Sequence, residues 1–334
     1  MQVALRQQAG LGTAVLSAAA FGTSGAFATA LIDSGWSPAA AVTARLLVAA
    51  AVLTVPALLM LRGRYRLLVR EGRSVTSYGI LAIGAAQLCY FNTVARLSVG
   101  VALLLEYLGI LLVVGWLWLR HGHRPRRLTV AGAATALIGL ALVLDVTGNH
   151  HLDPVGVLWG LGAAVGLAVY FVVSAQGDNA LPPIAMAWGG MVIASIFLGV
   201  VGLLGIVPIS AGTQPVQFLH YRTSWLVPVL GISLVAGVFA YSSGITAARA
   251  LGAKLASFLG LAEVLFAVLF AWLLLGQLPR PVQLVGGAFL VAGVALVQWD
   301  ELRTAEADRA PQDSAADAQP APAPRLVTAG ARRD

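Results

Sequence analysis

Apolar runs of about 20 residues, separated by short polar segments, recur along almost the whole chain. A helix needs about 20 apolar residues to cross roughly 30 Å of hydrocarbon, so each run is long enough to span a membrane. The runs predict ten transmembrane helices, over residues 11–33, 39–61, 76–97, 99–119, 128–145, 155–174, 184–207, 225–247, 254–275 and 279–299. The pattern therefore predicts an all-α, polytopic membrane protein.

Composition supports this class. Hydrophobic residues make up 59% of the 334 residues and charged residues only 10%, whereas a soluble domain of ordinary composition is about 45–50% apolar. After Asp300 the composition changes to Ala, Pro, Asp, Gln and Arg without an apolar period, so residues 301–334 are predicted to form a disordered cytoplasmic tail. The single cysteine, Cys89, excludes an intrachain disulfide and is interpreted as a packing residue.

The basic residues predict the orientation. With a cytoplasmic N-terminus, 17 of the 21 Lys and Arg residues fall in cytoplasmic loops and the tail, while Arg45 lies within a span. The positive-inside rule then predicts a cell-membrane protein with both termini cytoplasmic. The pI near 10.2 arises from arginines beside span ends, where anionic lipid headgroups are the expected partner, so we do not expect binding to nucleic acid.

The chain also repeats itself. Residues 125–145, which begin Pro-Arg-Arg-Leu-Thr-Val, resemble residues 279–300, which begin Pro-Arg-Pro-Val-Gln-Leu. Each half then holds five spans, and an odd number of spans inverts the second copy in the membrane, as in many secondary transporters. We therefore predict one five-helix repeat in residues 1–150 and a second in residues 151–300.

Two glutamates, Glu106 and Glu263, lie near the middle of apolar runs at matching places in the two halves. An ionised carboxylate in hydrocarbon costs several kcal/mol, so it is kept where it lines a cavity or has a function. Because burial disfavours the charged form, such a group can take up a proton on one side and release it on the other. Alternatively, either glutamate binds the ammonium group of a substrate, or pairs with Arg45 to hold two helices together.

Other polar side chains predict a substrate cavity near the glutamates. Gln87 and Tyr90 are three residues apart and share a helix face, whereas Asn92 lies on a different side. Tyrosines in the fourth, sixth and eighth runs add hydroxyl groups, with helix packing as the alternative role for each. The candidate substrate-binding or coupling residues are Glu106, Glu263, Tyr107, Tyr90, Gln87, Tyr170, Tyr241 and Arg45.

The segments around both glutamates, residues 100–109 (Gly-Val-Ala-Leu-Leu-Leu-Glu-Tyr-Leu-Gly) and 256–263 (Ala-Ser-Phe-Leu-Gly-Leu-Ala-Glu), resemble the EamA family of the drug/metabolite transporter superfamily. The resemblance covers residues 11–299 and is greatest to the threonine/homoserine exporter branch, to which Tyr170 and the residues up to Gln176 are also similar. It implies export of small amphipathic metabolites such as amino acids, driven by the proton gradient through alternating access.

The chain departs from the family pattern at two positions. Ile110 stands where members usually have a proline, which removes an expected helix kink, and Gln277 stands where a glutamate is common. Both departures put the transfer of mechanistic detail from the family in question.

Other classes of protein fit the sequence less well. No Gly-Lys-Ser/Thr follows a glycine-rich strand, so the sequence does not predict an ATP-driven pump. An intramembrane enzyme would need a metal site or a nucleophile with its base at membrane depth, but the histidines all fall in predicted loops: His121, His123, His150, His151 and His220. We expect no cofactor and no metal. A non-transporting sensor or scaffold stays open, and the predicted partners are a small-molecule substrate, protons and the lipid bilayer. The sequence does not indicate an oligomeric state.

Overall fold

The computed structural model describes residues 2–94, 96–97, 99–122, 125–144, 153–176, 181–218, 221–275 and 278–317, and in these residues the chain is almost entirely helical. The elements in chain order are α1 (Gln2–Gly22), α2 (Ser24–Asp33), α3 (Pro38–Met60), α4 (Tyr65–Arg70), α5 (Gly72–Ser77), the π-helix η1 (Tyr78–Ala85), α6 (Ala86–Val94), α7 (Val99–Tyr107), α8 (Gly109–His121), α9 (Arg127–Val143), α10 (Pro154–Ser174), α11 (Pro183–Leu203), β1 (Val216–Phe218), β2 (Tyr221–Thr223), α12 (Leu226–Gly231), the π-helix η2 (Ile232–Phe239), α13 (Ala240–Gly260), α14 (Ala262–Leu275) and α15 (Pro281–Asp317).

Among the described residues, eight helical segments are long and apolar enough to cross a membrane, so this is a multi-pass membrane protein. They are Gln8–Asp33, Pro38–Met60, Gly72–Thr93, Val101–Arg120, Pro154–Ser174, Pro183–Leu203, Leu226–Gly260 and Pro281–Asp300. The fifth predicted span corresponds to α9, which is apolar but has only 17 residues. The segment Leu226–Gly260 contains the eighth predicted span and the start of the ninth, with non-helical Gly252 between them, and α14 forms the rest of the ninth. The count of ten stays a prediction.

The eighth and ninth predicted spans meet at a break in the helix. The sequence predicts a loop over residues 248–253, and Gly252 has non-helical dihedrals (φ +80°, ψ +163°), so α13 consists of two helices that meet at this residue. A φ of +80° is a left-handed value that L side chains rarely adopt, which explains a glycine here. The residues on both sides of Gly252 are helical, so the two helices join at one residue and not through a six-residue loop.

Two helices break beside the candidate glutamates. Glu106 is the penultimate residue of α7 and Glu263 is the second residue of α14. Leu108 separates α7 from α8 but keeps right-handed helical dihedrals (φ −58°, ψ −18°), so the effect of Ile110 on a kink near Glu106 stays a prediction. At Gly109, the first residue of α8, a Cβ would lie 2.5 Å from the carbonyl oxygen of Ala164. The break therefore accompanies a close approach of α10, not a proline.

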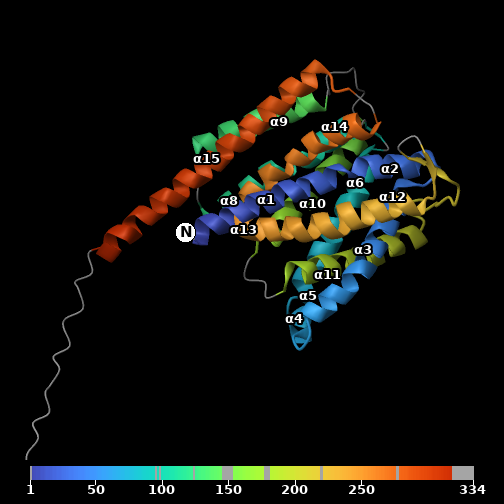
Figure 1. Ribbon diagram of the computed structural model, residues 1–334, viewed down its shortest axis with the longest axis horizontal. Helices are drawn as coiled ribbons and strands as arrows, with labels where there is room; N and C mark the ends of the chain where they lie inside the picture. Colours follow the sequence, from blue (N-terminus) through green and yellow to red (C-terminus); the bar gives the residue numbers. More distant parts are fainter. Residues whose placement is uncertain are drawn as a thin grey trace, which may run out of the picture.

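The helices pack in antiparallel and crossing pairs that join distant parts of the sequence. In Figure 1, α1 lies along α13, and α9 lies along α15 at one edge of the molecule. Glycines form the seam between α9 and α15: a Cβ on Gly286 would lie 2.7 Å from the carbonyl oxygen of Gly139, and one on Gly293 would lie 2.6 Å from that of Gly132. Glycines thus let the backbones of these two helices approach closely.

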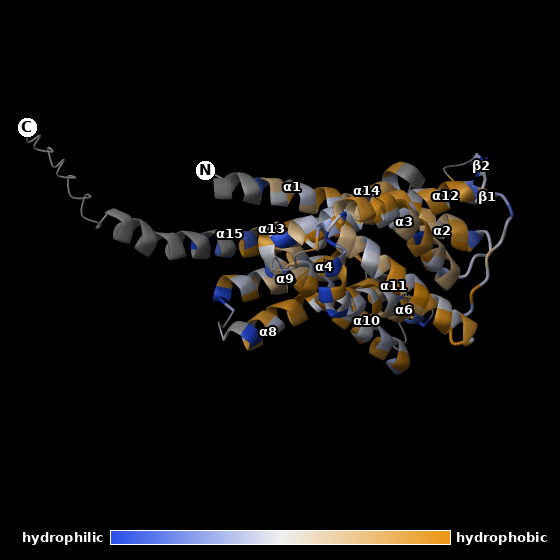
Figure 2. Ribbon diagram, turned by 90° about the horizontal axis from the view of Figure 1, so that it is seen from below, coloured by the Kyte–Doolittle hydropathy of each residue, from blue (hydrophilic) through white to orange (hydrophobic). Residues whose placement is uncertain are grey.

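One end of the molecule carries a hairpin that the hydrophobic pattern does not predict. β1 pairs antiparallel with β2, with Val216 opposite Thr223. Nearby, the Ser37 amide donates to the carbonyl of Ser210 at 2.8 Å, and the indole of Trp36 donates to a neighbouring carbonyl of the same segment. Figure 2 shows hydrophobic residues along the helices and hydrophilic residues at the hairpin. The segments before α3 and before β1 therefore close this end together.

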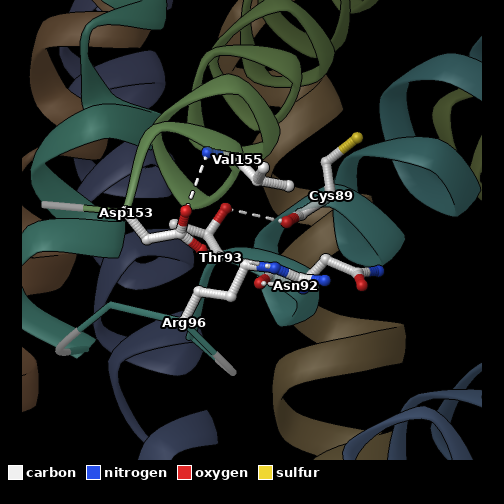
Figure 3. Close-up of polar contacts among 6 residues, drawn as sticks. All are labelled: Cys89, Asn92, Thr93, Arg96, Asp153 and Val155. Atoms are coloured by element: carbon white, nitrogen blue, oxygen red, sulfur yellow. Dashed lines mark hydrogen bonds and ion pairs between the residues drawn. The ribbon is translucent and has the colours of Figure 1, made fainter.

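A polar clamp joins the end of α6 to the start of α10 (Figure 3). Arg96 and Asp153 form an ion pair with Nε and Oδ2 3.6 Å apart, and Asp153 also caps α10 by accepting from the Val155 amide at 3.1 Å. The Thr93 hydroxyl donates to the carbonyl of Cys89 at 2.9 Å. Cys89 itself is a free, half-buried thiol against α10, as the predicted packing role requires.

The last helix extends further than predicted. The sequence predicts disorder from residue 301, whereas α15 continues to Asp317. Residues 301–317 contain several Ala, Glu and Arg, which are good helix formers. Extending an existing helix also avoids the cost of nucleation. Disorder stays a prediction for residues 318–334, which lie outside the described residues.

Candidate functional site

A cavity of about 370 Å³ lies between the two halves of the chain. Its wall is built from α1, α2, α3, η1, α6, α7, α10, η2, α13 and α14, and most of the lining side chains are apolar. All the candidate residues that the sequence predicts lie on this wall: Arg45, Gln87, Tyr90, Glu106, Tyr107, Tyr170, Tyr241 and Glu263. The structure therefore brings together side chains that are up to 218 positions apart in the sequence (45 to 263).

The two glutamates enter the cavity from the two helix breaks. Both side chains are partly exposed to the cavity. Neither carboxylate has an ion-pair partner within 4.0 Å among the described residues. Two carboxylates that face one cavity without an ion-pair partner within 4.0 Å can each accept a proton or bind a cationic group.

The tyrosine and glutamine side chains around the glutamates add polar groups. The Tyr107 hydroxyl donates to the carbonyl of Gly260 at 3.4 Å, which ties α7 to the end of α13. Gln87 and Tyr90 both line the cavity, as their spacing predicts. The Asn92 side chain instead donates to the carbonyl of Leu88 on its own helix at 2.9 Å. The predicted polar face of this span is therefore confirmed.

An aromatic wall lines the other side. The Tyr241 ring meets Phe21 edge-on at 5.0 Å and Tyr170 edge-on at 5.8 Å between ring centroids, and Tyr170 meets Phe171 at 4.9 Å. The Tyr170 hydroxyl is buried and has no hydrogen-bond partner. These rings serve in helix packing and in the cavity wall at once, so the two roles weighed from the sequence coincide.

Arg45 is the basic residue in this wall. It is 5% exposed, and its Cζ lies 6.0 Å from the centroid of the Tyr241 ring. Its Nε and Nη2 atoms are buried without a hydrogen-bond partner. The interpretation that Arg45 pairs with Glu106 or Glu263 is wrong, because no ion pair within 4.0 Å joins it to either residue. Helix packing and the aromatic wall hold the three charged groups apart.

Comparison with family models identifies the fold and its class. The model described as the EamA-like transporter family matches twice, over residues 8–145 and 154–299. The chain belongs to the EamA-like transporter family. The two matches together cover most of the chain and leave out the residues after 299, as the resemblance predicts.

Named relatives of this EamA-like chain are also transporters. "Uncharacterized transporter YwfM" of Bacillus subtilis (strain 168) is 27% identical over 209 residues, or 62% of this chain and 67% of that protein. "Probable terminal-alkyne amino-acid exporter" of Streptantibioticus cattleyicolor is 32% identical over 182 residues, or 53% of this chain and 56% of that protein. This chain thus matches about two thirds of the first relative and just over half of the second.

A solved structure has the same fold. It is described as "Crystal structure of protein" and matches with a TM-score of 0.70 at 20% identity, over 90% of this chain and 99% of that one. At this identity the likeness extends to the fold alone. The arrangement of the helices is therefore shared with an experimentally determined structure.

The described part of the chain contains no set of side chains that could bind a metal ion. No three His, Cys, Asp or Glu side chains come together there as metal ligands do. His123, His150, His151 and His220 lie outside the described residues, as does Gln277.

Sequence reasoning missed several cavity residues of this EamA-like protein. Ser17, Phe21 and Ser24 of the first span line the cavity. Ser17 donates to the carbonyl of Ala240 at 2.7 Å, so it joins the first span to the eighth. These residues follow the i, i+4, i+7 spacing of one helix face, which is the signal that marks this face from sequence.

Proposed function

We propose that the protein is a secondary active transporter that exports small amphipathic metabolites such as amino acids by proton-coupled alternating access. The observation that carries the proposal is the pair Glu106 and Glu263, which reach one cavity from the two halves and form no ion pair within 4.0 Å. Membership of a transporter family supports transport in general. The name of one relative, an amino-acid exporter, favours this class of substrate.

Symmetry of local features supports ten spans in an inverted 5+5 repeat, with repeats in residues 1–150 and 151–300. The same family model matches each half. A π-helix of eight residues lies in the third predicted span (η1) and another of the same length in the eighth (η2). A helix break beside a glutamate lies in the fourth and in the ninth. Matching distortions at matching places are expected of a duplicated unit.

The lining of the cavity favours a conformation in which the cavity is closed at the end of the molecule near the N-terminus. The lining reaches Ile32 and Pro38 at the hairpin end. Toward the other end, α1 and α13 approach closely: a Cβ on Gly10 would lie 2.9 Å from the Cβ of Ala250. If the N-terminus is cytoplasmic, as the arginines predict, the cavity opens at the hairpin end, toward the outside of the cell.

A transport cycle follows from this state. Substrate enters from the cytoplasm while the glutamates are ionised, and the halves rock to open outward. Protonation of Glu106 or Glu263 from outside then releases the substrate and favours return. Glu106 lies at the carboxyl end of α7 and Glu263 in the first turn of α14. Helix dipoles disfavour negative charge at a carboxyl end and favour it at an amino end, so we assign proton uptake to Glu106.

Transport by inside-out vesicles tests this function. We expect an imposed proton gradient to drive uptake of at least one compound from a radiolabelled panel of amino acids and nucleobases. Glu106→Gln should abolish the gradient dependence while the protein still inserts and folds. Glu71→Gln is the matched control, because Glu71 pairs with Arg70 outside the cavity.

Two results would contradict the proposal in different ways. If gradient-driven uptake is unchanged in Glu106→Gln, Glu106 does not couple transport to protons, and Glu263 becomes the candidate coupling residue. Absence of uptake for every compound, in a preparation that is folded, would favour a sensor or scaffold instead.

A further inference from the structure

The Arg45 guanidinium is an unusual group to leave unpaired. It is 5% exposed and lies within the predicted second span, where a charged side chain is costly unless it is paired or hydrogen-bonded. Yet two of its nitrogen atoms have no partner, and no described carboxylate lies within ion-pair distance. Helix packing alone does not need a charge here, so the unmade hydrogen bonds indicate a missing anionic partner.

The two unpartnered atoms define the shape of that partner. They are Nε and Nη2, which form one edge of the guanidinium plane and present two parallel N–H groups. Carboxylates accept such a pair of bonds in the bidentate fork arrangement, with better geometry than a single spherical anion. The Cζ atom of Arg45 lies 6.0 Å from the centroid of the Tyr241 ring, within the range of a cation–π contact that helps to hold the guanidinium group in place.

A second orphan group lies on the same wall. The Tyr170 hydroxyl is buried, has no partner, and lines the same cavity as Arg45. Its ring contacts the Tyr241 ring that supports Arg45. A hydroxyl can donate one more hydrogen bond to a bound carboxylate. Two buried polar side chains therefore face one cavity, and both lack a partner.

We propose that Arg45 binds the carboxylate of the transported solute through Nε and Nη2. The proposal rests on the proposed function, since it names the group by which that solute is recognised. Arg45 is then a specificity-determining residue of the cavity, not a link between helices. The glutamates in the same cavity bind a cationic group, so a solute that carries both charges, a zwitterionic amino acid, satisfies all three residues.

The experiment measures binding without any gradient, on the full chain in lipid nanodiscs. The probes are three pairs of an amino acid and its amide: L-leucine and L-leucinamide, L-phenylalanine and L-phenylalaninamide, and L-threonine and L-threoninamide. Each amide keeps the ammonium group and the side chain but loses the carboxylate. We expect wild-type protein to bind at least one acid about ten- to a hundredfold more tightly than its amide, as charge-assisted hydrogen bonds predict.

Variants at Arg45 test whether this residue causes the preference for the acid over its amide. Arg45→Gln should reduce the acid-to-amide ratio to about one, mainly by weakening binding of the acid. Arg45→Lys keeps the charge without the fork and should give an intermediate ratio, which provides a second test if the glutamine variant does not fold. Arg249→Gln is the matched control: Arg249 donates to the carbonyl of Leu181 at 2.7 Å and does not line the cavity. Its ratio should equal that of wild type.

The outcomes separate this proposal from the proposed function. An acid-to-amide ratio near one in wild type, a ratio unchanged in Arg45→Gln, or failure of every acid to bind would overturn the role of Arg45. If the ratio follows Arg45 but the acids never move with a proton gradient, the binding site stands and the transport function fails.

Discussion

Replacing Gly286 with alanine tests the close helix contact between α9 and α15. Gly286 lies in α15 against α9, and a Cβ there would lie 2.6 Å from the backbone nitrogen of Val143, 2.7 Å from the carbonyl oxygen of Gly139 and 2.7 Å from the Cβ of Leu142. Two of these three neighbours are backbone atoms, which cannot rotate away. The helices must therefore separate by most of an ångström to regain normal contact.

The expected cost follows from that separation. Overpacking a well-packed contact costs about 1–3 kcal/mol. The same change removes the flexibility of glycine in the unfolded chain and gains about 1 kcal/mol of helix propensity. Gly199 in α11 isolates the second effect, because a Cβ there meets no atom within 4 Å. We expect the free energy of unfolding of Gly286→Ala to lie about 1–3 kcal/mol below that of Gly199→Ala.

Reversible unfolding in mixed micelles measures the free energy of unfolding of both variants. Circular dichroism checks that each variant keeps its helix content and is therefore folded before unfolding begins. If Gly286→Ala is as stable as Gly199→Ala, the close approach of α9 and α15 is not present in the folded protein. The glycine seam would then not be what joins these two helices.

Three further changes have definite expected outcomes in the same unfolding assay. Asp153→Ala removes the cap on the Val155 amide and should lower the free energy of unfolding by about 0.5–2 kcal/mol; no change would exclude a role of this cap in stability. Gly252→Ala forces a side chain into φ +80° and should cost about 1–2 kcal/mol, whereas a gain like that of Gly199→Ala would show a relaxed backbone. Arg45→Met removes a buried unpaired charge and should stabilise the ligand-free protein by about 1 kcal/mol or more; a loss of stability would reveal a partner for Arg45.

Hydropathy located most spans because a bilayer imposes one strong requirement, an apolar surface over about 20 residues. It did not report where α15 ends, because residues 301–317 are polar enough to leave the membrane and are still helical. The hairpin of β1 and β2 has strands of three residues, too short to leave a periodic signal.

The site was predictable to the extent that polar side chains are rare at membrane depth. That rarity marked Glu106, Glu263 and Arg45 and the polar face of Gln87. Contacts between them were not predictable, because a sequence does not give the distance between helices. The ion pair considered for Arg45 agrees with the charges, but no carboxylate of Glu106 or Glu263 lies within 4.0 Å of its nitrogen atoms. Phe21 was missed because an aromatic residue has the same pattern in a core and in a cavity wall.

The unpaired charges account for how an empty cavity can favour a solute. If Arg45 were paired with Glu263, a solute would first have to break that pair, and its own contacts would only replace those lost. Because Arg45 and the glutamate are not paired, the empty cavity has a high free energy. A zwitterion lowers that free energy when its carboxylate binds Arg45 and its ammonium group binds the glutamate. Differential binding of this kind is what a ligand needs to shift a conformational equilibrium. Protonation of Glu106 would then weaken one end of that binding, so solute release and proton entry would be coupled through the same cavity.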